Sequence, residues 1–156
     1  MVAIVFKILL ANVLSDGDQI RMYTVFCHLL IILTGTYFGI RRHKMTTRSS
    51  SIKDDILAGM RVSGIYALCI TLAVIVHYSL IDPEYLNKAI AERLELATEF
   101  SETHPEYDLA NAKKGLEFTF NLKVYAAFTT FALLTAGTIY SIILAILVKK
   151  MNIWKV

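Results

Sequence analysis

The chain has 156 residues, which is the length of one compact unit. Hydrophobic residues make up 56% of it, a fraction too high for an ordinary soluble domain of this size. Its 16 basic and 13 acidic residues leave a net charge of only +3, and the basic ones cluster beside apolar runs, which suits a lipid bilayer better than nucleic acid. Two cysteines, Cys27 and Cys69, lie inside apolar runs, where a disulfide framework is implausible.

The first apolar run covers residues 1–14, and its polar residues are Lys7 and Asn12. As a helix it reaches about 21 Å, which is short of the ~30 Å hydrocarbon core of a bilayer. We interpret it as a shortened first span, either tilted in a thinned bilayer or lacking a turn at its start, rather than as an interfacial helix. Turn-forming residues then predict a tight turn over residues 15–19.

Residues 22–40 are predicted to form the second span, because this stretch contains a single ionisable residue, His28. Gly35 and Gly39 lie four positions apart in this stretch. This spacing lets two membrane helices approach closely, although it is common by chance. A strongly basic segment follows the second span.

The third span is predicted over residues 60–81, because twenty residues from Val62 to Ile81 carry no formal charge. Ser51 and Asp54 precede it with the spacing of a capping box, which predicts the start of the third helix. The span ends where an aspartate and a proline follow Ile81.

Residues 82–117 form a polar segment. Asp82, Pro83 and Glu84 suit the first positions of a new helix, which we expect to begin at Asp82. Apolar residues recur at helical spacing over residues 84–100, which predicts an amphipathic helix on the membrane surface or over the mouth of the bundle. Pro105 ends that helix.

The fourth span is predicted over residues 118–148. No proline interrupts residues 108–148, so we expect one continuous helix there. Lysines at 149, 150 and 155 follow this span, and Trp154 is a plausible interfacial anchor.

The distribution of charge predicts the orientation of the protein in the membrane. Residues 82–117 hold nine acids against four bases, whereas the loop between spans two and three and the C-terminus are basic. By the positive-inside rule both termini are cytoplasmic and the acidic segment is outside. The predicted fold is all-α: a polytopic membrane protein, one domain over residues 1–156, with four transmembrane helices and an amphipathic outer-side helix between spans three and four.

Several stretches resemble a small four-helix bacterial membrane family known as domain of unknown function forty-one ninety-nine. They are IKDDILAGMRVSGIY, IDPEYL, FNLKVY and GTIYSIILAILVKK, in this order along the chain. The resemblance covers nearly the whole chain, and it departs at the start, where the first span is shorter than in the family. It implies a four-helix fold in the bacterial inner (plasma) membrane and supplies no catalytic residues.

Four ionisable side chains lie within or at the ends of the spans, all on the predicted outer side: Lys7, His28, His77 and Lys123. At 100° per residue, His28, His77 and Lys123 each share a helix face with small residues, which mark the side that packs on another helix. These helix-packing residues are Gly35 and Gly39 beside His28, Gly59 and Ser63 with Tyr66 beside His77, and Gly137 and Ser141 beside Lys123.

Two interpretations of these residues remain open. In the functional one, His28, His77, Lys123, Lys7 and Tyr66 form a polar site that binds an anion, a lipid headgroup or a proton. In the structural one, the histidines bond to tyrosine or threonine hydroxyls or to backbone carbonyls, and the lysines extend toward water. Two histidines without a placed carboxylate or thiolate fall short of a metal site, so we expect neither a metal nor a cofactor.

Enzyme signatures are absent from the sequence, so we expect a non-catalytic protein. The leading hypothesis is an accessory or structural subunit, or a homo-oligomer, that packs through its small-residue helix faces against a protein partner or itself. The alternative is a small oligomeric transporter or channel that uses the outer-side His/Lys site. A membrane enzyme acting on lipid comes third, because among acidic residues only Glu117 is placed near Lys123.

Overall fold

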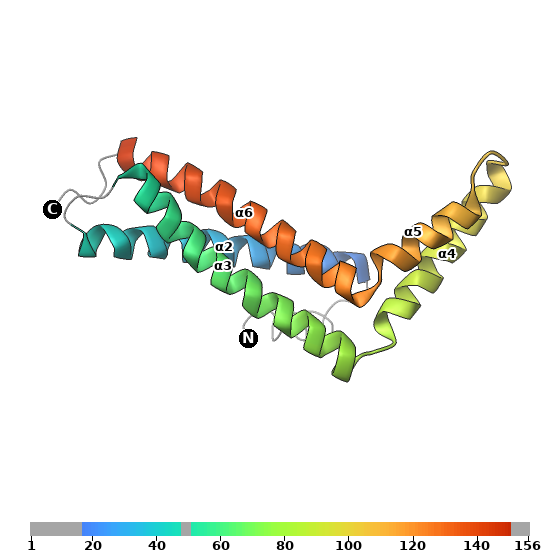
Figure 1. The fold of residues 1–156 in the computed structure, drawn as a ribbon. Helices are drawn as coiled ribbons and strands as arrows, with labels where there is room; N and C mark the ends of the chain where they lie inside the picture. Colours follow the sequence, from blue (N-terminus) through green and yellow to red (C-terminus); the bar gives the residue numbers. More distant parts are fainter. Residues whose placement is uncertain (1–16, 48–50, 151–156) are drawn as a thin grey trace. The chain divides into compact units, whose positions relative to one another are not determined.

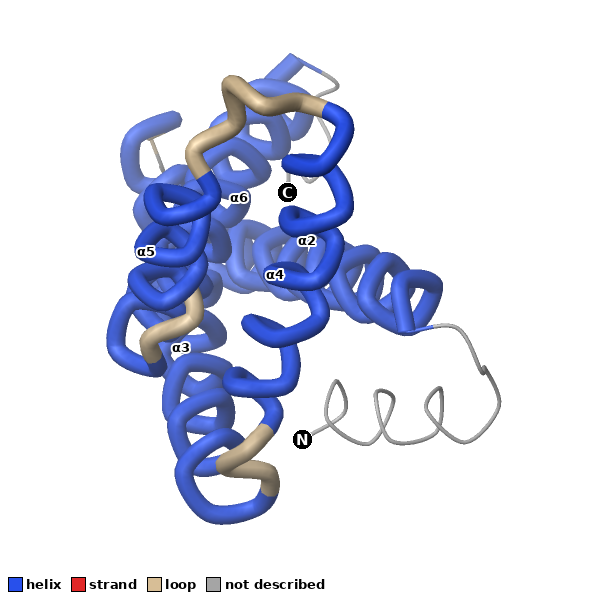
Figure 2. Tube along the Cα trace, turned by 90° about the vertical axis from the view of Figure 1, so that its right-hand side faces the viewer, coloured by secondary structure: helices blue, strands red, loops and turns tan. Residues whose placement is uncertain are grey.

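The computed structural model describes residues 17–47 and 51–150. Within these residues every regular element is a helix (Figures 1 and 2). In chain order the elements are α2 (Gly17–Thr46), α3 (Ile52–Val76), the π-helical turn η1 (His77–Ile81), α4 (Tyr85–Thr103), α5 (Leu109–Thr119) and α6 (Leu122–Lys150). The prediction of an all-α protein is therefore confirmed.

Three helical stretches are long and apolar enough to cross a membrane: Met22–Thr46, Ile52–Ile81 and Leu122–Lys150. They overlap the predicted second, third and fourth spans, residues 22–40, 60–81 and 118–148, with different bounds. The predicted first span, with Lys7, lies outside the described residues. The structure thus describes a multi-pass membrane protein with three candidate spans.

Helix α2 is longer than the sequence pattern predicted. It begins at Gly17, so the expected turn over residues 15–19 is wrong for its last three residues. The other end continues to Thr46, and His43 and Lys44 lie in the last turn, where positive charge is favourable.

Side-chain caps define the starts of two other helices. Before α3, the backbone N–H and hydroxyl of Ser51 donate to Asp54 Oδ2 at 3.0 and 2.7 Å, and the Asp54 N–H donates to Ser51 Oγ at 3.3 Å. This reciprocal pattern confirms the predicted capping box. Before α5, Asp108 Oδ1 accepts a hydrogen bond from the Asn111 N–H at 3.0 Å.

The helix expected to begin at Asp82 begins at Tyr85. The Tyr85 N–H donates to the Asp82 carbonyl at 3.3 Å, so the residues between them form a turn instead of the first helical positions. Before this turn, α3 continues into the wider π-helical turn η1. There the Asp82 N–H donates to the His77 carbonyl, five residues back, at 2.9 Å. Pro83 has no N–H with which to continue this ladder.

The single helix expected over residues 108–148 is interrupted at Phe120 and Asn121. The Asn121 side chain accepts a hydrogen bond from the Lys123 N–H at 3.1 Å and so acts as the cap of α6. This prediction was wrong because a proline was taken as the required breaker, whereas an asparagine that competes for backbone N–H groups also ends one helix and begins another.

By their contacts the residues divide into two compact units. Unit one is residues 1–66 with 133–156, and its described part contains α2, the first part of α3 and the second part of α6. Its buried positions recur every four residues along each helix: Ile32, Thr36 and Ile40 on α2, Asp55, Gly59 and Ser63 on α3, and Leu133, Gly137, Ser141 and Ala145 on α6. Many of these side chains are small, so the three helices pack closely.

Unit two is residues 67–132. In it α4 and α5 run side by side in opposite directions, joined by a loop that contains Pro105 (Figures 1 and 2). Helix α4 overlaps the helix predicted over residues 84–100, and Pro105 follows its end. We call α4, the loop and α5 the hairpin.

Candidate functional site

Glycines on α2 receive a side chain from α3 in unit one. A Cβ added at Gly39 would lie 2.7 Å from Val62 Cγ2 and 3.3 Å from the backbone oxygen of Ala58. One turn earlier, a Cβ at Gly35 would lie 3.3 Å from Val62 Cγ1. Val62 therefore packs directly on the α2 backbone, which is the close approach that small residues permit in membrane helices.

Two crossed glycine–serine pairs join α3 and α6. A Cβ at Gly59 would lie 2.6 Å from Ser141 Oγ, and a Cβ at Gly137 would overlap the side chain of Ser63. Both serines are buried, and each hydroxyl donates to a carbonyl of its own helix, Ser141 to Gly137 at 2.7 Å and Ser63 to Gly59 at 3.3 Å. The helices thus approach without leaving the hydroxyls unpaired.

His28 and Tyr66 come together within unit one. The Nδ1 atom of His28 on α2 lies 2.6 Å from the hydroxyl oxygen of Tyr66 on α3, and the two rings meet edge to face. Both side chains are half-buried. The bond links residues 38 positions apart and gives the imidazole a polar partner inside the candidate spans.

Among the described residues of unit one, the most buried ionisable group is one that the sequence analysis did not single out. Asp55, on α3, is only 1% exposed, and its Oδ2 lies 2.7 Å from Nζ of Lys44, on α2. Its Oδ1 is buried and has no hydrogen-bond partner in the described part of the chain, and the same is true of His43 Nε2. An ion pair this deep joins the end of α2 to the start of α3.

A sequence signal for Asp55 did exist. Asp55 precedes Gly59 and Ser63 at intervals of four residues, so it lies on the small-residue face of α3, whereas the adjacent Asp54 turns away and caps the helix. Extending the face of Gly59 one turn toward the start of the helix would have placed a carboxylate inside the bundle.

The remaining members of the predicted polar site lie in unit two or outside the described residues. His77 is half-buried at the start of η1, and its ring meets the ring of Tyr78 edge to face at 4.9 Å. Lys123 is exposed in the first turn of α6. Both belong to unit two, whereas His28 and Tyr66 belong to unit one, and Lys7 lies outside the described residues.

Aromatic rings fill the centre of unit two. Tyr78 of η1 stacks on Tyr85 of α4 with ring centroids 4.9 Å apart, and it meets Tyr125 of α6 edge to face at 5.6 Å. Phe120, at the break before α6, stacks on Tyr125 at 6.3 Å. This cluster joins the end of the candidate span Ile52–Ile81 and the start of the candidate span Leu122–Lys150 to the start of the hairpin. Tyrosines are enriched at such interfacial positions.

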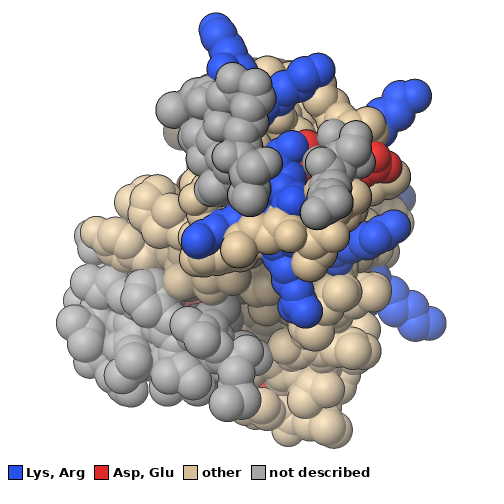
Figure 3. Space-filling view, turned by 90° about the vertical axis from the view of Figure 1, so that its left-hand side faces the viewer, with Lys and Arg blue, Asp and Glu red and all other residues tan. Residues whose placement is uncertain are grey.

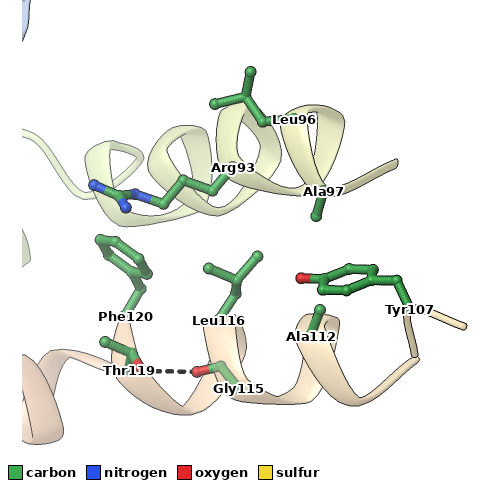
Figure 4. A pocket seen from close by; sticks show the side chains of 9 residues that line it. All are labelled: Arg93, Leu96, Ala97, Tyr107, Ala112, Gly115, Leu116, Thr119 and Phe120. Carbon is green, nitrogen blue, oxygen red and sulfur yellow. Dashed lines mark hydrogen bonds between the residues drawn. The ribbon is translucent and has the colours of Figure 1, made fainter. Parts of the chain in front are cut away.

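The hairpin contains an open groove between α4 and α5, with a volume of about 690 Å³ (Figure 4). Small residues keep it open: Ala97 on α4 points toward α5, and Ala112 and Gly115 of α5 leave space opposite. A Cβ added at Gly115 would meet no atom of the described chain within 4 Å. At the border of the groove Leu96 is 64% exposed.

Polar and aromatic groups close the two ends of this groove. At one end the Arg93 guanidinium carbon lies 5.1 Å from the centroid of the Phe120 ring, which is a cation–π contact. At the other end Tyr107 points into the groove, and its ring meets that of Phe100 edge to face at 5.1 Å. In the described part of the chain no acidic side chain forms an ion pair with Arg93.

Glu117, the candidate acid for lipid chemistry, is exposed on α5 and lies 4.0 Å from the ammonium group of Lys113. This is an ordinary pair along one helix. Among residues 17–47 and 51–150, no three His, Cys, Asp or Glu side chains gather as the ligands of a metal ion would.

Residues 1–150 match the family described as protein of unknown function (DUF4199), and the chain belongs to this family. The resemblance inferred from the motifs is thereby confirmed. Comparisons with curated proteins and with solved structures found no match.

Proposed function

We propose that this member of the DUF4199 family is a non-catalytic integral membrane protein that associates with a second copy of itself through the hairpin. The groove between α4 and α5 carries this proposal. It lies outside the candidate spans, it is lined mainly by small and apolar residues, and a two-helix hairpin cannot cover such a face by itself.

Leu96 is the side chain that fits the groove of a second copy. It borders the groove on α4 and is largely exposed. Ala112 and Gly115, on α5, leave space in the groove for a branched apolar side chain. In a two-fold symmetric pair each copy would place its Leu96 against the other copy's α5. Such an interface uses the same surface twice, as isologous dimers do.

Charge complementarity favours a second copy of this chain over an unrelated apolar helix. Glu92 and Glu99 lie four residues before and three residues after Leu96, so all three share one side of α4, and both glutamates are exposed. The groove itself contains Arg93. When Leu96 enters the partner's groove, these glutamates approach a guanidinium that has no acidic partner within its own described chain.

Topology completes the proposal. Basic side chains lie between α2 and α3 and at the end of α6, whereas residues 82–117, which contain most of the hairpin, are acidic. By the positive-inside rule we place both termini in the bacterial cytoplasm and the hairpin on the outer side of the inner (plasma) membrane. There the second copy would be bound outside the hydrocarbon layer.

The proposal is tested by filling the groove. Gly115→Leu should raise the dissociation constant of the dimer about tenfold or more, because a branched side chain then occupies the space that receives Leu96. The measurement is light scattering after size exclusion in a mild detergent, over a range of protein concentrations.

Gly115→Ala is the matched control at the same position, and Gly64→Leu is the control outside the hairpin. A Cβ at Gly64 also meets no atom of the described chain within 4 Å, so both controls should keep the dimer. A monomeric wild-type protein, or a Gly115→Leu variant that dimerises like the wild type, would overturn the proposal.

Transport is the second candidate function, and the bond between His28 and Tyr66 favours it. This bond holds a titratable ring between two candidate spans, as in proton relays. Proton flux into vesicles that contain the protein and a trapped pH-sensitive dye tests this candidate. Flux that is absent, or that persists unchanged in His28→Ala, His77→Ala and Lys123→Ala, would exclude this polar site from transport.

A further inference from the structure

Basic side chains gather at one end of unit one, where α2 ends, α3 begins and α6 ends (Figure 3). We call six exposed cations the basic end. Five lie near these helix ends and the sixth, Arg61, lies nine residues after the start of α3, where its charge acts on Asp54: Arg41, Arg42, Lys53, Lys149, Lys150 and Arg61. They come from three helices, all within unit one.

The acidic residues at this end are already engaged. Asp55 is buried in its ion pair with Lys44, and Asp54 accepts both hydrogen bonds from Ser51. Asp54 faces the charge of Arg61 without an ion pair between them. In the described part of the chain, none of the six cations of the basic end forms an ion pair.

The hairpin provides a contrast within the same molecule. There Lys88 of α4 pairs at 3.3 Å with Glu84, the residue just before that helix, and Lys113 pairs at 4.0 Å with Glu117 on the same helix, α5. The basic end therefore has an excess of positive charge that attracts an external anion. In the hairpin, ion pairs along the helices neutralise part of the charge.

Arg61 indicates what kind of anion this is. It lies on α3 between Leu57 and Ile65 at intervals of four residues, so the three side chains form one row along the helix. Leu57 is 50% exposed and Ile65 is 65% exposed, within a stretch long and apolar enough to cross a membrane. A guanidinium in such a row reaches the headgroup region by extending along apolar surface.

We propose that the basic end binds anionic phospholipid, with the lipid phosphate on the Arg61 guanidinium and the acyl chains along the apolar row of α3. Arginine is suited to this role because its planar fork donates two parallel hydrogen bonds to phosphate oxygens. The remaining cations of the basic end attract further anionic headgroups. A soluble phosphate ion would use the same guanidinium but would gain nothing from Leu57 and Ile65.

Lipid binding to the purified full-length protein tests this proposal. The protein in mild detergent is titrated with phosphatidylglycerol and, separately, with phosphatidylcholine, and bound lipid is counted by native mass spectrometry. We expect phosphatidylglycerol to bind at least about tenfold more tightly than phosphatidylcholine, since a polybasic surface attracts anionic lipid with roughly a fivefold gain for each basic side chain.

Arg61→Gln should weaken the binding of phosphatidylglycerol about fivefold, whereas Arg61→Lys should weaken it less, because the charge remains but the fork is lost. The double variant Arg41→Gln/Arg42→Gln on α2 should also weaken it, and it serves as the second test if Arg61→Gln does not fold. Lys113→Gln, on the hairpin, is the matched control and should leave binding unchanged.

Two results would overturn the proposal. Equal affinities for the two lipids, or undiminished affinity in both the Arg61→Gln protein and the double variant, would mean that the basic end does not select anionic headgroups. Displacement of phosphatidylglycerol by millimolar inorganic phosphate would assign the site to soluble phosphate. Resistance to phosphate together with a weaker Arg61→Gln variant would support the lipid.

Discussion

Gly59→Ala offers the sharpest test of how unit one is packed. The added methyl group would lie 2.6 Å from Ser141 Oγ, 2.8 Å from Thr36 Cγ2 and 3.0 Å from Ser141 Cβ. Thr36 and Ser141 are both 0% exposed, so neither has solvent to move into. The threonine is also restrained at χ1, because branched side chains have few rotamers in a helix.

The magnitude follows from two opposing terms. Replacing glycine by alanine inside a helix stabilises it by about 1 kcal/mol, whereas forcing an extra methyl group into a packed interior costs roughly 1–3 kcal/mol. With two contacts below 3.0 Å, we expect the second term to dominate and Gly59→Ala to lower the free energy of unfolding by about 1 kcal/mol.

The matched control is Gly64→Ala, five positions further along α3. A Cβ there meets no atom of the described chain within 4 Å, so only the helix term remains, and this variant should be more stable by about 0.5–1 kcal/mol. Unfolding in mixed micelles, followed by circular dichroism, measures both variants. Adding Ser141→Gly to Gly59→Ala should recover part of the loss in a double-mutant cycle.

If Gly59→Ala proved as stable as Gly64→Ala, the close approach of α3 to α6 at this position would be refuted. The same conclusion would follow if the double-mutant cycle showed no coupling between Gly59 and Ser141. A uniform loss in all three variants would instead indicate a general intolerance of α3 to substitution, which the open space at Gly64 does not predict.

Three further predictions concern polar contacts and are measured by the same unfolding assay. Asp55→Asn should destabilise the protein by about 3 kcal/mol because it leaves Lys44 without its buried partner, and the double variant Asp55→Leu/Lys44→Met should be less affected; equal losses would contradict a buried pair. Tyr66→Phe should remove about 1 kcal/mol by taking the hydroxyl from His28, whereas an unchanged stability would show that water replaces it. Asn121→Ala should cost about 1 kcal/mol by removing the cap of α6, and no effect would mean that the cap is not needed there.

Much of the architecture could be predicted because its causes are local in the sequence. The uncharged run from Val62 to Ile81 is long enough to cross the bilayer whatever it packs against, since length and apolar surface decide this. A proline disrupts a helix interior whatever its surroundings, and Pro105 follows the end of α4. Ser51 caps α3 through Asp54, only three residues away. Such features involve neighbours in the chain, so composition and spacing reveal them.

The site was less predictable because its contacts join distant residues. Face analysis indicated that His28 points into the bundle, but only the packing of α2 on α3 selected Tyr66 as its partner. Helical spacing allowed a continuous helix through Phe120 and Asn121, and the choice between that helix and a capped break depends on the aromatic rings and on α4 packed beside it. The groove at Gly115 also exists only because two helices lie together.

The sequence by itself therefore determined the helical class, the candidate spans and the distribution of charge, each of which follows from side-chain type and order along the chain. Only the tertiary structure decided that Asp55 is buried against Lys44 while Asp54 remains at the surface, and that Gly59 receives Ser141. The physical reason is range: hydrophobic length and capping act over a few residues, whereas close packing and buried ion pairs depend on which helices meet and in what register.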